Sequence, residues 1–183
     1  MRTTTVIVAV AGILLLAGCG QGSNEPSTSG TTQPVSPEEG TMRLTSPAFE
    51  DQAKIPAEYT CDGEDVSPPL VITDIPQGTE TLALIVEDPD SPGGTWDHWV
   101  VFDIPPTDQI PRGATGLGTD GVNTFGATGY GGPCPPSGSH RYLHRVFALD
   151  IGLGLTEGAT KTEVLEAMKG HVVAEAGLVG IYR

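Results

Sequence analysis

Short apolar runs recur along the chain, and their length and composition are typical of β-strands. Residues 81–86 form a continuous run that follows Gly78 and ends at an Asp-Pro turn. Residues 99–104 and 142–149 are similar, because both are rich in β-branched and aromatic side chains and both end at turn-forming residues. Runs of this length between turn signals indicate buried strands. We therefore expect three central strands, joined by long irregular loops that are rich in the chain's 25 glycines and 16 prolines.

One segment near the end of the chain has helical spacing instead. Thr160 and Glu163 have the spacing of a capping box, in which each side chain satisfies a backbone N–H at the start of a helix. One face of the helix would then carry the apolar residues Val164, Leu165, Met168 and Val172. The pattern predicts a helix from residue 160 towards 172, interrupted at Gly170. Residues 178–182 are expected to form a last strand or an extended segment.

The first residues have the pattern of a bacterial lipoprotein signal. Arg2 precedes an apolar stretch over residues 6–16, which is too short to span a bilayer comfortably, and the stretch ends in Leu16-Ala17-Gly18-Cys19. Such a signal predicts removal of residues 1–18 and attachment of lipid to Cys19, which would anchor the protein to the cell membrane on its extracytoplasmic side. The alternative is an ordinary secretory signal in which the cysteine is incidental.

A polar segment separates this signal from the apolar runs. Residues 20–40 are rich in Gly, Ser, Thr, Pro, Gln and Glu, and Val35 is their only large apolar side chain. Such a composition cannot bury enough apolar surface to offset the entropy lost on ordering. We expect residues 19–41 to be a disordered tether and residues 42–183 to form one globular domain.

Charge narrows the classes of partner. The chain has 183 residues, of which 38% are hydrophobic, and its 9 basic and 23 acidic side chains give a net charge of −14. This charge repels a polyphosphate backbone, so nucleic acid is not expected as a partner. A single small anion remains compatible with the charge, because a local group of N–H donors can override the net field.

Three cysteines leave two after lipidation of Cys19. Cys61 and Cys134 then form an even pair in an oxidising compartment, where a disulfide between them is natural. The alternative is that Cys134 remains a free thiol and lines a pocket, because it lies in a Gly-Pro-Cys-Pro-Pro loop.

Two short clusters contain the candidate chemistry. The first runs from Asp88 through Asp90 to Trp96 and His98, and the second runs from the Gly-Gly-Pro-Cys-Pro-Pro loop at 131–136 to His140 and Tyr142. Strand alternation places His140, Tyr142, His144 and Val146 on one face of the third predicted strand. If the strand ends meet at one rim, imidazoles, a phenol and carboxylates converge there.

This combination of groups suits the binding of a small anion. Imidazole and phenol donate hydrogen bonds to phosphate or carboxylate oxygens, and Asp88 could orient an imidazole. The glycines of the 131–136 loop are expected to add backbone N–H donors. The sequence lacks G-x-S-x-G, P-loop, H-E-x-x-H and C-x-x-C motifs. We therefore expect a binding protein without catalytic activity, and without a cofactor or metal.

At these positions the chain resembles the phosphatidylethanolamine-binding protein family, in its bacterial Raf-kinase-inhibitor-like branch. The resemblance covers residues 42–183 and rests on several motifs in order: Tyr59 to Leu70, Asp88-Pro89-Asp90 through His98-Trp99, Gly129 to Pro136, His140-Arg141-Tyr142 and Gly170-His171. It implies a mainly β fold of two antiparallel sheets with long Pro- and Gly-rich loops and a short C-terminal helical segment. It also implies an anion pocket formed by Asp88, Asp90, Pro92, Trp96, His98, Cys134, Pro135, Pro136, His140 and Tyr142.

Some positions depart from the family pattern or have a structural alternative. Asp97 stands where animal members of the family have a histidine, and alternation from His98 indicates that it faces away from the pocket. His144 replaces an expected aromatic or aliphatic residue and is interpreted as a partly buried polar group. Asp90 either contacts ligand or forms an ion pair with Arg141. His171 is interpreted as a contact at the helix end.

Three hypotheses about function follow. The first is a membrane-tethered binding protein for a small anionic group, such as a phospholipid head group, a phosphorylated metabolite or a protein carboxylate. The second is an inhibitor module that binds a protease or kinase through exposed loops around residues 107–126, as members of the family are reported to do. The third is a metal-dependent hydrolase that uses Asp88, His98 and His140.

Overall fold

The computed structural model describes residues 40–183. The predicted signal at 1–18, the predicted lipidation site Cys19 and nearly all of the predicted tether at 19–41 lie outside this range. Within residues 40–183, no helix has the length and apolar character needed to cross a membrane.

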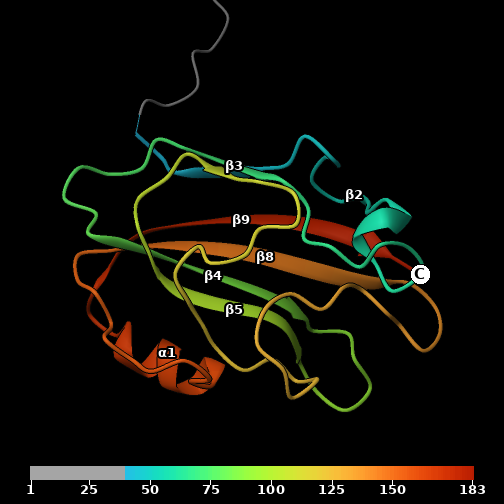
Figure 1. The fold of residues 1–183 in the computed structure, drawn as a ribbon. Helices are drawn as coiled ribbons and strands as arrows, with labels where there is room; N and C mark the ends of the chain where they lie inside the picture. Colours follow the sequence, from blue (N-terminus) through green and yellow to red (C-terminus); the bar gives the residue numbers. More distant parts are fainter. Residues whose placement is uncertain (1–39) are drawn as a thin grey trace, which may run out of the picture. The chain divides into compact units, whose positions relative to one another are not determined.

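Residues 40–183 contain two β-sheets and one short α-helix, as the resemblance implied (Figure 1). The smaller sheet has the order β1-β3-β6 and contains β1 (Arg43–Thr45), β3 (Leu70–Thr73) and β6 (Gln109–Ile110). The larger sheet has the order β2-β9-β8-β4-β5-β7, with bounds Ala53–Lys54, Val172–Tyr182, His140–Leu149, Thr81–Asp88, Trp96–Ile104 and Thr119–Asp120. All pairs are antiparallel except β2 with β9. The remaining elements are the 3₁₀ helix η1 (Ala57–Tyr59) and α1 (Lys161–Ala167).

The three predicted central strands are present, and each is longer than its apolar run. β4 continues to Asp88, β5 begins at Trp96, and β8 begins at His140. The polar ends are genuine strand residues, since Asp88 pairs with Trp96 and His140 pairs with Tyr182. Asp88, Trp96, His98, His140 and Tyr142 therefore lie on the ends of paired strands, which fix their backbones more firmly than loops would, whereas the candidates Asp90, Pro92 and Cys134 to Pro136 lie in loops.

The predicted helix is shorter than its apolar pattern. The capping box of Thr160 and Glu163 is formed, and α1 ends at Ala167. Gly170 has a φ of 80°, a left-handed conformation that glycine adopts easily at a helix end. The assignment of Val172 to the helix face is wrong, because Val172 begins β9, which pairs with β8 as far as Tyr182. The expected last strand at 178–182 is the second half of this longer strand.

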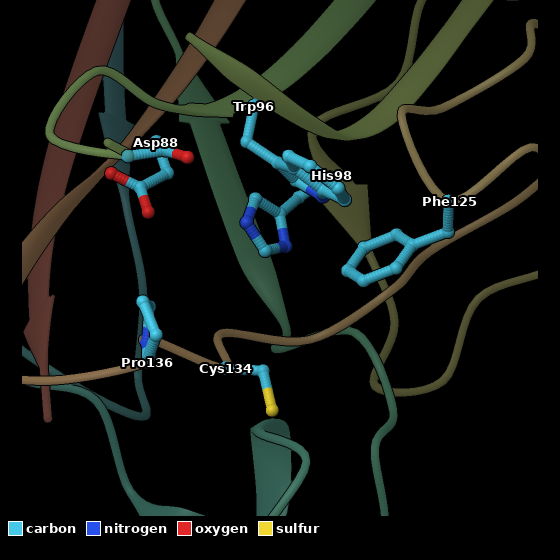
Figure 2. A pocket seen from close by; sticks show the side chains of 7 residues that line it. Asp88, Trp96, His98, Phe125, Cys134 and Pro136 are labelled. Carbon is cyan, nitrogen blue, oxygen red and sulfur yellow. The ribbon is translucent and has the colours of Figure 1, made fainter. Parts of the chain in front are cut away.

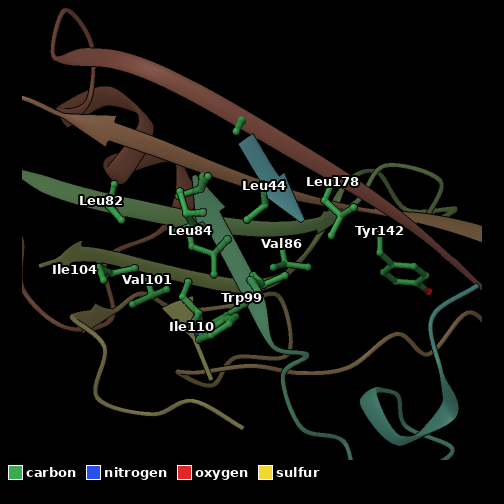
Figure 3. Close-up of a cluster of buried hydrophobic side chains, with 14 of the residues drawn as sticks. Leu44, Leu82, Leu84, Val86, Trp99, Val101, Ile104, Ile110, Tyr142 and Leu178 are labelled. Atoms are coloured by element: carbon green, nitrogen blue, oxygen red, sulfur yellow. The ribbon is translucent and has the colours of Figure 1, made fainter. Parts of the chain in front are cut away.

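The larger sheet is covered on both faces, and this explains the continuous apolar run at 81–86. Leu82, Leu84 and Val86 face the smaller sheet in one cluster of buried side chains (Figure 3). Ala83 and Ile85 face the other side, in a second cluster that includes α1 side chains. A strand buried on both faces cannot alternate between apolar and polar residues. The alternation predicted for β8 is confirmed, since His140, Tyr142, His144 and Val146 are all buried.

Candidate functional site

The ends of β4 and β5 form one side of a pocket of about 240 Å³. We call it the His98 pocket and define it by the residues that line it: Asp88, Ser91, Trp96, His98, Phe125, Cys134 and Pro136 (Figure 2). In Figure 2 the His98 ring lies between Asp88 and Phe125, with Cys134 and Pro136 on the opposite wall.

The structure brings together part of the predicted set. The predicted residues that line the pocket are Asp88, Trp96, His98, Cys134 and Pro136. His140 and Tyr142 lie one layer behind the lining, where they contact Asp88 and His98. Asp90, Pro92 and Pro135 do not line it. Sequence reasoning missed Ser91 and Phe125; the one available signal for Phe125 was a lone large aromatic residue within a loop of small and polar residues.

Asp88 orients His140, as its type and position suggested. One carboxylate oxygen lies 2.7 Å from Nδ1 of His140, and the other accepts a hydrogen bond of 2.8 Å from the backbone N–H of Asp90. Both side chains are buried, with relative exposures of 5% and 8%. Because the carboxylate accepts at Nδ1, that nitrogen carries a proton, and Nε2 is the atom through which His140 can interact further.

Asp90 forms the ion pair that was one of its two interpretations. Its carboxylate accepts hydrogen bonds from Nε and Nη2 of Arg141 at 2.9 and 2.7 Å, and also from the backbone N–H of Arg141 at 2.9 Å. These Arg141 donors hold the pKa of Asp90 well below its ordinary value. The pair joins the turn after β4 to the first residues of β8, and it occupies the carboxylate that was expected to contact ligand.

His98 presents one ring nitrogen to the pocket. Its Nδ1 lies 2.7 Å from the carbonyl oxygen of Gly131, which makes Nδ1 the protonated nitrogen and leaves Nε2 as the available one. Burial lowers the pKa of His98 below its ordinary value, although the Gly131 carbonyl and the Asp88 carboxylate act in the opposite direction. The ring also meets Phe125 and Tyr142 edge to face, with centroids 5.4 and 5.1 Å apart. At neutral pH the ring is therefore a neutral acceptor at Nε2.

The expectation that the 131–136 loop supplies several backbone N–H donors is wrong. Gly131 donates to the carbonyl of His98 at 2.9 Å, and Gly132 donates to Oδ1 of Asp65 at 2.7 Å. Three of the other four residues are prolines, which have no N–H. The glycines serve close approach instead, since a Cβ on Gly132 would lie 2.3 Å from the same Asp65 oxygen. Among residues 131–136, only the backbone N–H of Cys134 is left as a donor for a ligand.

Two buried polar groups at the site have no hydrogen-bond partner among residues 40–183. They are Nε1 of Trp96, which belongs to the pocket lining, and the hydroxyl of Tyr142 behind it. Burial raises the pKa of Tyr142 well above its ordinary value, and the charge of Asp88 adds to this effect, so the phenol keeps its proton. An unpaired buried donor costs about 1–3 kcal/mol. Such groups call for a partner, and a ligand with acceptor oxygens would supply one.

Cys61 and Cys134 are joined by a disulfide, with Cα atoms 5.5 Å apart. Cys134 therefore contributes a disulfide sulfur to the pocket wall, and the alternative of a free thiol does not apply. The backbone N–H of Cys61 also donates to the carbonyl of Pro133 at 3.2 Å. Together these links hold the 131–136 loop against the segment that follows η1.

The remaining predicted positions lie away from the ligand-facing wall. Asp97 contacts Lys161 of α1, on the far side of the sheet from His98, as alternation indicated. His144 is fully buried rather than partly buried, with a relative exposure of 1%. Nδ1 of His171, in the turn after α1, lies 2.9 Å from Oδ1 of Asp150. In the part of the chain that the structure describes, no three His, Cys, Asp or Glu side chains are grouped as metal ligands, so Asp88, His98 and His140 do not form such a cluster.

Comparison with known proteins gives consistent matches over the described domain. The family model described as phosphatidylethanolamine-binding protein matches residues 45–183. A UPF0098 protein of Methanothermobacter thermautotrophicus is 48% identical over 153 residues, which are 78% of this chain and 99% of the relative. A UPF0098 protein of Chlamydia muridarum is 46% identical over 147 residues, which are 77% of this chain and 98% of the relative.

Two solved structures share the fold. The crystal structure of a phosphatidylethanolamine-binding protein homologue from Chlamydia trachomatis superposes with a TM-score of 0.77 at 44% identity, covering 79% of this chain and 98% of that one. Escherichia coli YbcL, described as a new member of the mammalian phosphatidylethanolamine-binding protein family, superposes with a TM-score of 0.73 at 28% identity, covering 79% of this chain and 99% of that one.

Proposed function

The chain belongs to the phosphatidylethanolamine-binding protein family, and from this premise we propose that its His98 pocket binds a small oxyanion. The bound group would be the phosphate or carboxylate of a metabolite, or the phosphate of a phospholipid head group. The long-range field of a chain with a net charge of −14 opposes anions, so the attraction must come from donors at short range.

The observation that carries this proposal is that Trp96 lines the pocket and that its buried Nε1–H has no hydrogen-bond partner among residues 40–183. An indole N–H can only donate, so its missing partner is an acceptor. The hydroxyl of Tyr142 is a second buried group without a partner among the described residues, and Nε2 of His98 can hold a proton shared with an acidic oxygen of the ligand. An oxyanion beside Trp96 and His98 would supply the acceptor that the indole N–H lacks.

The bonds that Asp88, Cys134 and Ser91 make within the protein support binding without catalysis. Asp88 already has partners on both oxygens, and Cys134 is held in a disulfide. Within residues 40–183 no hydrogen bond links the Ser91 hydroxyl to His98 or to His140, so Ser91 is not paired with a base. A nucleophile paired with a base is the usual requirement for covalent hydrolysis.

We also propose that the domain is held at the extracytoplasmic surface of the cell membrane by lipid on Cys19. The support is the apolar stretch at 6–16 followed by Leu16-Ala17-Gly18-Cys19, and the polar segment after it. The Cys61–Cys134 disulfide fits an oxidising compartment of this kind. In this arrangement a tether carries the binding domain clear of the lipid head groups.

Calorimetric titration of the full chain in non-ionic detergent tests the oxyanion site. Inorganic phosphate, methyl phosphate and acetate serve as ligands, and Trp96→Phe removes the N–H while it keeps an aromatic ring. We expect saturable binding to the unmodified chain, weakened about tenfold in Trp96→Phe by the loss of one hydrogen bond to a charged group. Tyr182→Phe removes a hydroxyl bonded to Asp62 outside the pocket and should not change affinity. Absence of binding for all three ligands would refute the proposal.

Binding of a protein partner is the second candidate function. Phe125 is 50% exposed and lies in the loops around residues 107–126, through which the second hypothesis expects a partner to bind. Exposed large aromatic side chains are enriched where proteins bind one another. Loss of oxyanion binding in Trp96→Phe would favour the first candidate. A partner whose affinity depends on Phe125 and is unaffected by Trp96→Phe would favour the second.

A further inference from the structure

Two cationic side chains without an acidic partner lie together at the end of the larger sheet. Residues 40–183 contain eight of the chain's nine Lys and Arg side chains, and five of these form ion pairs: Arg112, Arg141, Arg145, Lys161 and Lys169. Arg43, Lys54 and Arg183 form no ion pair within residues 40–183. Lys54 and Arg183 line the same hollow, of about 460 Å³, and Arg43 does not. In a chain with a net charge of −14, two cations that converge without an acid call for an anion from outside.

We call this the Lys54 hollow and define it by the residues that line it: Lys54, Pro135, Ser137, Gly138 and Arg183. It shares no residue with the His98 pocket. A smaller hollow of about 220 Å³ contains the same two cations together with Ser139, Ile181 and Tyr182. No acidic side chain lines either one, and neither cation is paired with the main-chain carboxylate of Arg183. A bound anion would therefore meet two positive charges at short range.

The sheet fixes the backbone under both cations. Lys54 belongs to β2 and is paired with Ile181 of β9, and the N–H of Ile55 donates to the carbonyl of Ile181 at 2.8 Å. Nζ of Lys54 lies 5.9 Å from the centre of the Tyr182 ring, and the hydroxyl of that ring donates to Asp62 at 2.6 Å. Arg183 directly follows Tyr182, the last residue of β9. Only the two side chains must be ordered when an anion binds, which keeps the entropic cost of binding low.

The loop before β8 adds uncharged donors to the same hollow. Ser137 and Ser139 are exposed and carry hydroxyl groups, and the backbone N–H groups of residues 137–139 donate to no acceptor among residues 40–183. Gly138 has a φ of 73°, a left-handed conformation that glycine adopts without strain. Hydroxyl and N–H donors next to an ammonium and a guanidinium form a set that suits a tetrahedral oxyanion, because its oxygens accept from several directions.

We propose that the Lys54 hollow is a second oxyanion site, which binds a phosphate group between Lys54 and Arg183. A phosphate monoester matches the site better than a carboxylate, because its two charges balance the two cations and its three outer oxygens can accept from the guanidinium, the ammonium and a serine hydroxyl. A soluble phosphate monoester and the phosphodiester of a lipid head group both present this chemistry, and the experiment separates them. The inference is independent of the His98 pocket, with which the hollow shares no residue.

Two-dimensional ¹H–¹⁵N NMR of the full chain in non-ionic detergent tests the inference. Inorganic phosphate, dimethyl phosphate and acetate are added at constant ionic strength and pH 8. The amide signals of residues 137–139 report on the Lys54 hollow, and the indole N–H signal of Trp96 reports separately on the His98 pocket. Lys54→Gln/Arg183→Gln removes both positive charges from the hollow. Arg43→Gln/Lys169→Gln removes two positive charges elsewhere, so it is the control for net charge.

The signals of residues 137–139 should shift saturably with inorganic phosphate, with a dissociation constant of about 1–10 mM, as fits an exposed site. This constant should rise at least tenfold in Lys54→Gln/Arg183→Gln and less than twofold in the control. Acetate should bind at least threefold more weakly. Dimethyl phosphate that binds at least threefold more weakly assigns the site to soluble phosphate monoesters, and equal affinity assigns it to lipid phosphodiesters.

Three outcomes would overturn the inference: no saturable shift at residues 137–139, equal weakening in the two double variants, or acetate binding as tightly as phosphate. The Trp96 signal decides the oxyanion function of the His98 pocket in the same titration. Failure of either site is therefore seen without ambiguity about the other.

Discussion

Nδ1 of His140 and Oδ2 of Asp88 lie 2.7 Å apart, although 52 residues separate them in sequence. The contact exists because β4 and β8 are neighbouring antiparallel strands, so the end of one meets the beginning of the other. Asp88 itself lines the His98 pocket, and His140 lies directly behind it. The pair therefore links the stability of this end of β4 and β8 to the geometry of the site.

Replacing Asp88 by Asn should destabilise the fold. The change removes a charge-assisted hydrogen bond between two buried groups, and we expect the free energy of unfolding to fall by about 2 kcal/mol. Asp90→Asn is the matched control, because it weakens an ion pair whose arginine side chain is 57% exposed and should cost less than about 1 kcal/mol. Urea unfolding followed by fluorescence measures both. Equal losses in the two variants would contradict the buried role assigned to Asp88.

His144 should make the fold sensitive to acid. Burial lowers its pKa to about 4, against an ordinary value of 6.5, and its Nε2 has no partner among the described residues. Below pH 6.5, His144 therefore becomes protonated in the unfolded chain, whereas in the folded chain it stays neutral until about pH 4. Stability falls across that window by up to about 3 kcal/mol from this residue alone.

His144→Phe supplies the measurement for that window. A phenyl ring cannot titrate, and it can keep the packing against Phe49, whose ring centroid lies 5.6 Å away. The free energy of unfolding of the variant should decline less between pH 6.5 and pH 4 than that of the unmodified chain. Parallel curves for the two proteins would show that His144 titrates normally in the folded state.

Oxyanion affinity should rise as the pH falls. Burial holds the pKa of His98 in the unliganded protein below 6.5, so its ring is neutral at pH 7. A bound anion favours the protonated imidazolium, so binding is coupled to the uptake of a proton by His98. The dissociation constant for sulfate, which does not titrate in this range, should decrease as the pH is lowered from 8 to 5. His98→Asn keeps a donor for the Gly131 carbonyl but has no titratable ring, so its affinity should stay flat. A dissociation constant that does not change with pH in the unmodified chain would contradict proton uptake by His98.

Gly132 and Gly93 should respond very differently to alanine. A Cβ at Gly132 would lie 2.3 Å from Oδ1 of Asp65 and 2.8 Å from the carbonyl oxygen of Tyr59, whereas a Cβ at Gly93 would meet nothing within 4 Å. Gly132→Ala should therefore lower the free energy of unfolding by about 1–3 kcal/mol, the usual range for overpacking. Gly93→Ala should change it by less than about 0.5 kcal/mol. Thermal unfolding of the two variants under identical conditions decides this.

The apolar centre of the fold could be predicted from the sequence, and the polar ends of its strands could not. Residues 82–86 are buried on both faces, so they appear as an unbroken apolar run. Asp88 and Trp96 are paired strand residues, but their polar neighbours resemble a turn when only one segment is considered. Val172 fitted a helical pattern equally well, and only its pairing with Leu149 places it in β9.

The same limit applies to the site. Residue type and strand position predict Asp88 and His98, whereas Trp96 is predicted only by the resemblance to the family. The use of the Gly132 N–H was not predictable, because its acceptor Asp65 lies 67 residues earlier in the chain. The place of Phe125 in the lining of the His98 pocket depends on its packing against Gly131, a contact that no local pattern encodes.

The disulfide has a topological consequence. Cys61 and Cys134 are 73 residues apart, so the chain between them is a covalently closed ring that contains Asp88, His98 and Phe125. A protease that cuts once within the exposed segment 124–128 would open this ring without releasing a fragment. The nicked protein would migrate as one species under non-reducing conditions and would separate into two pieces only after reduction.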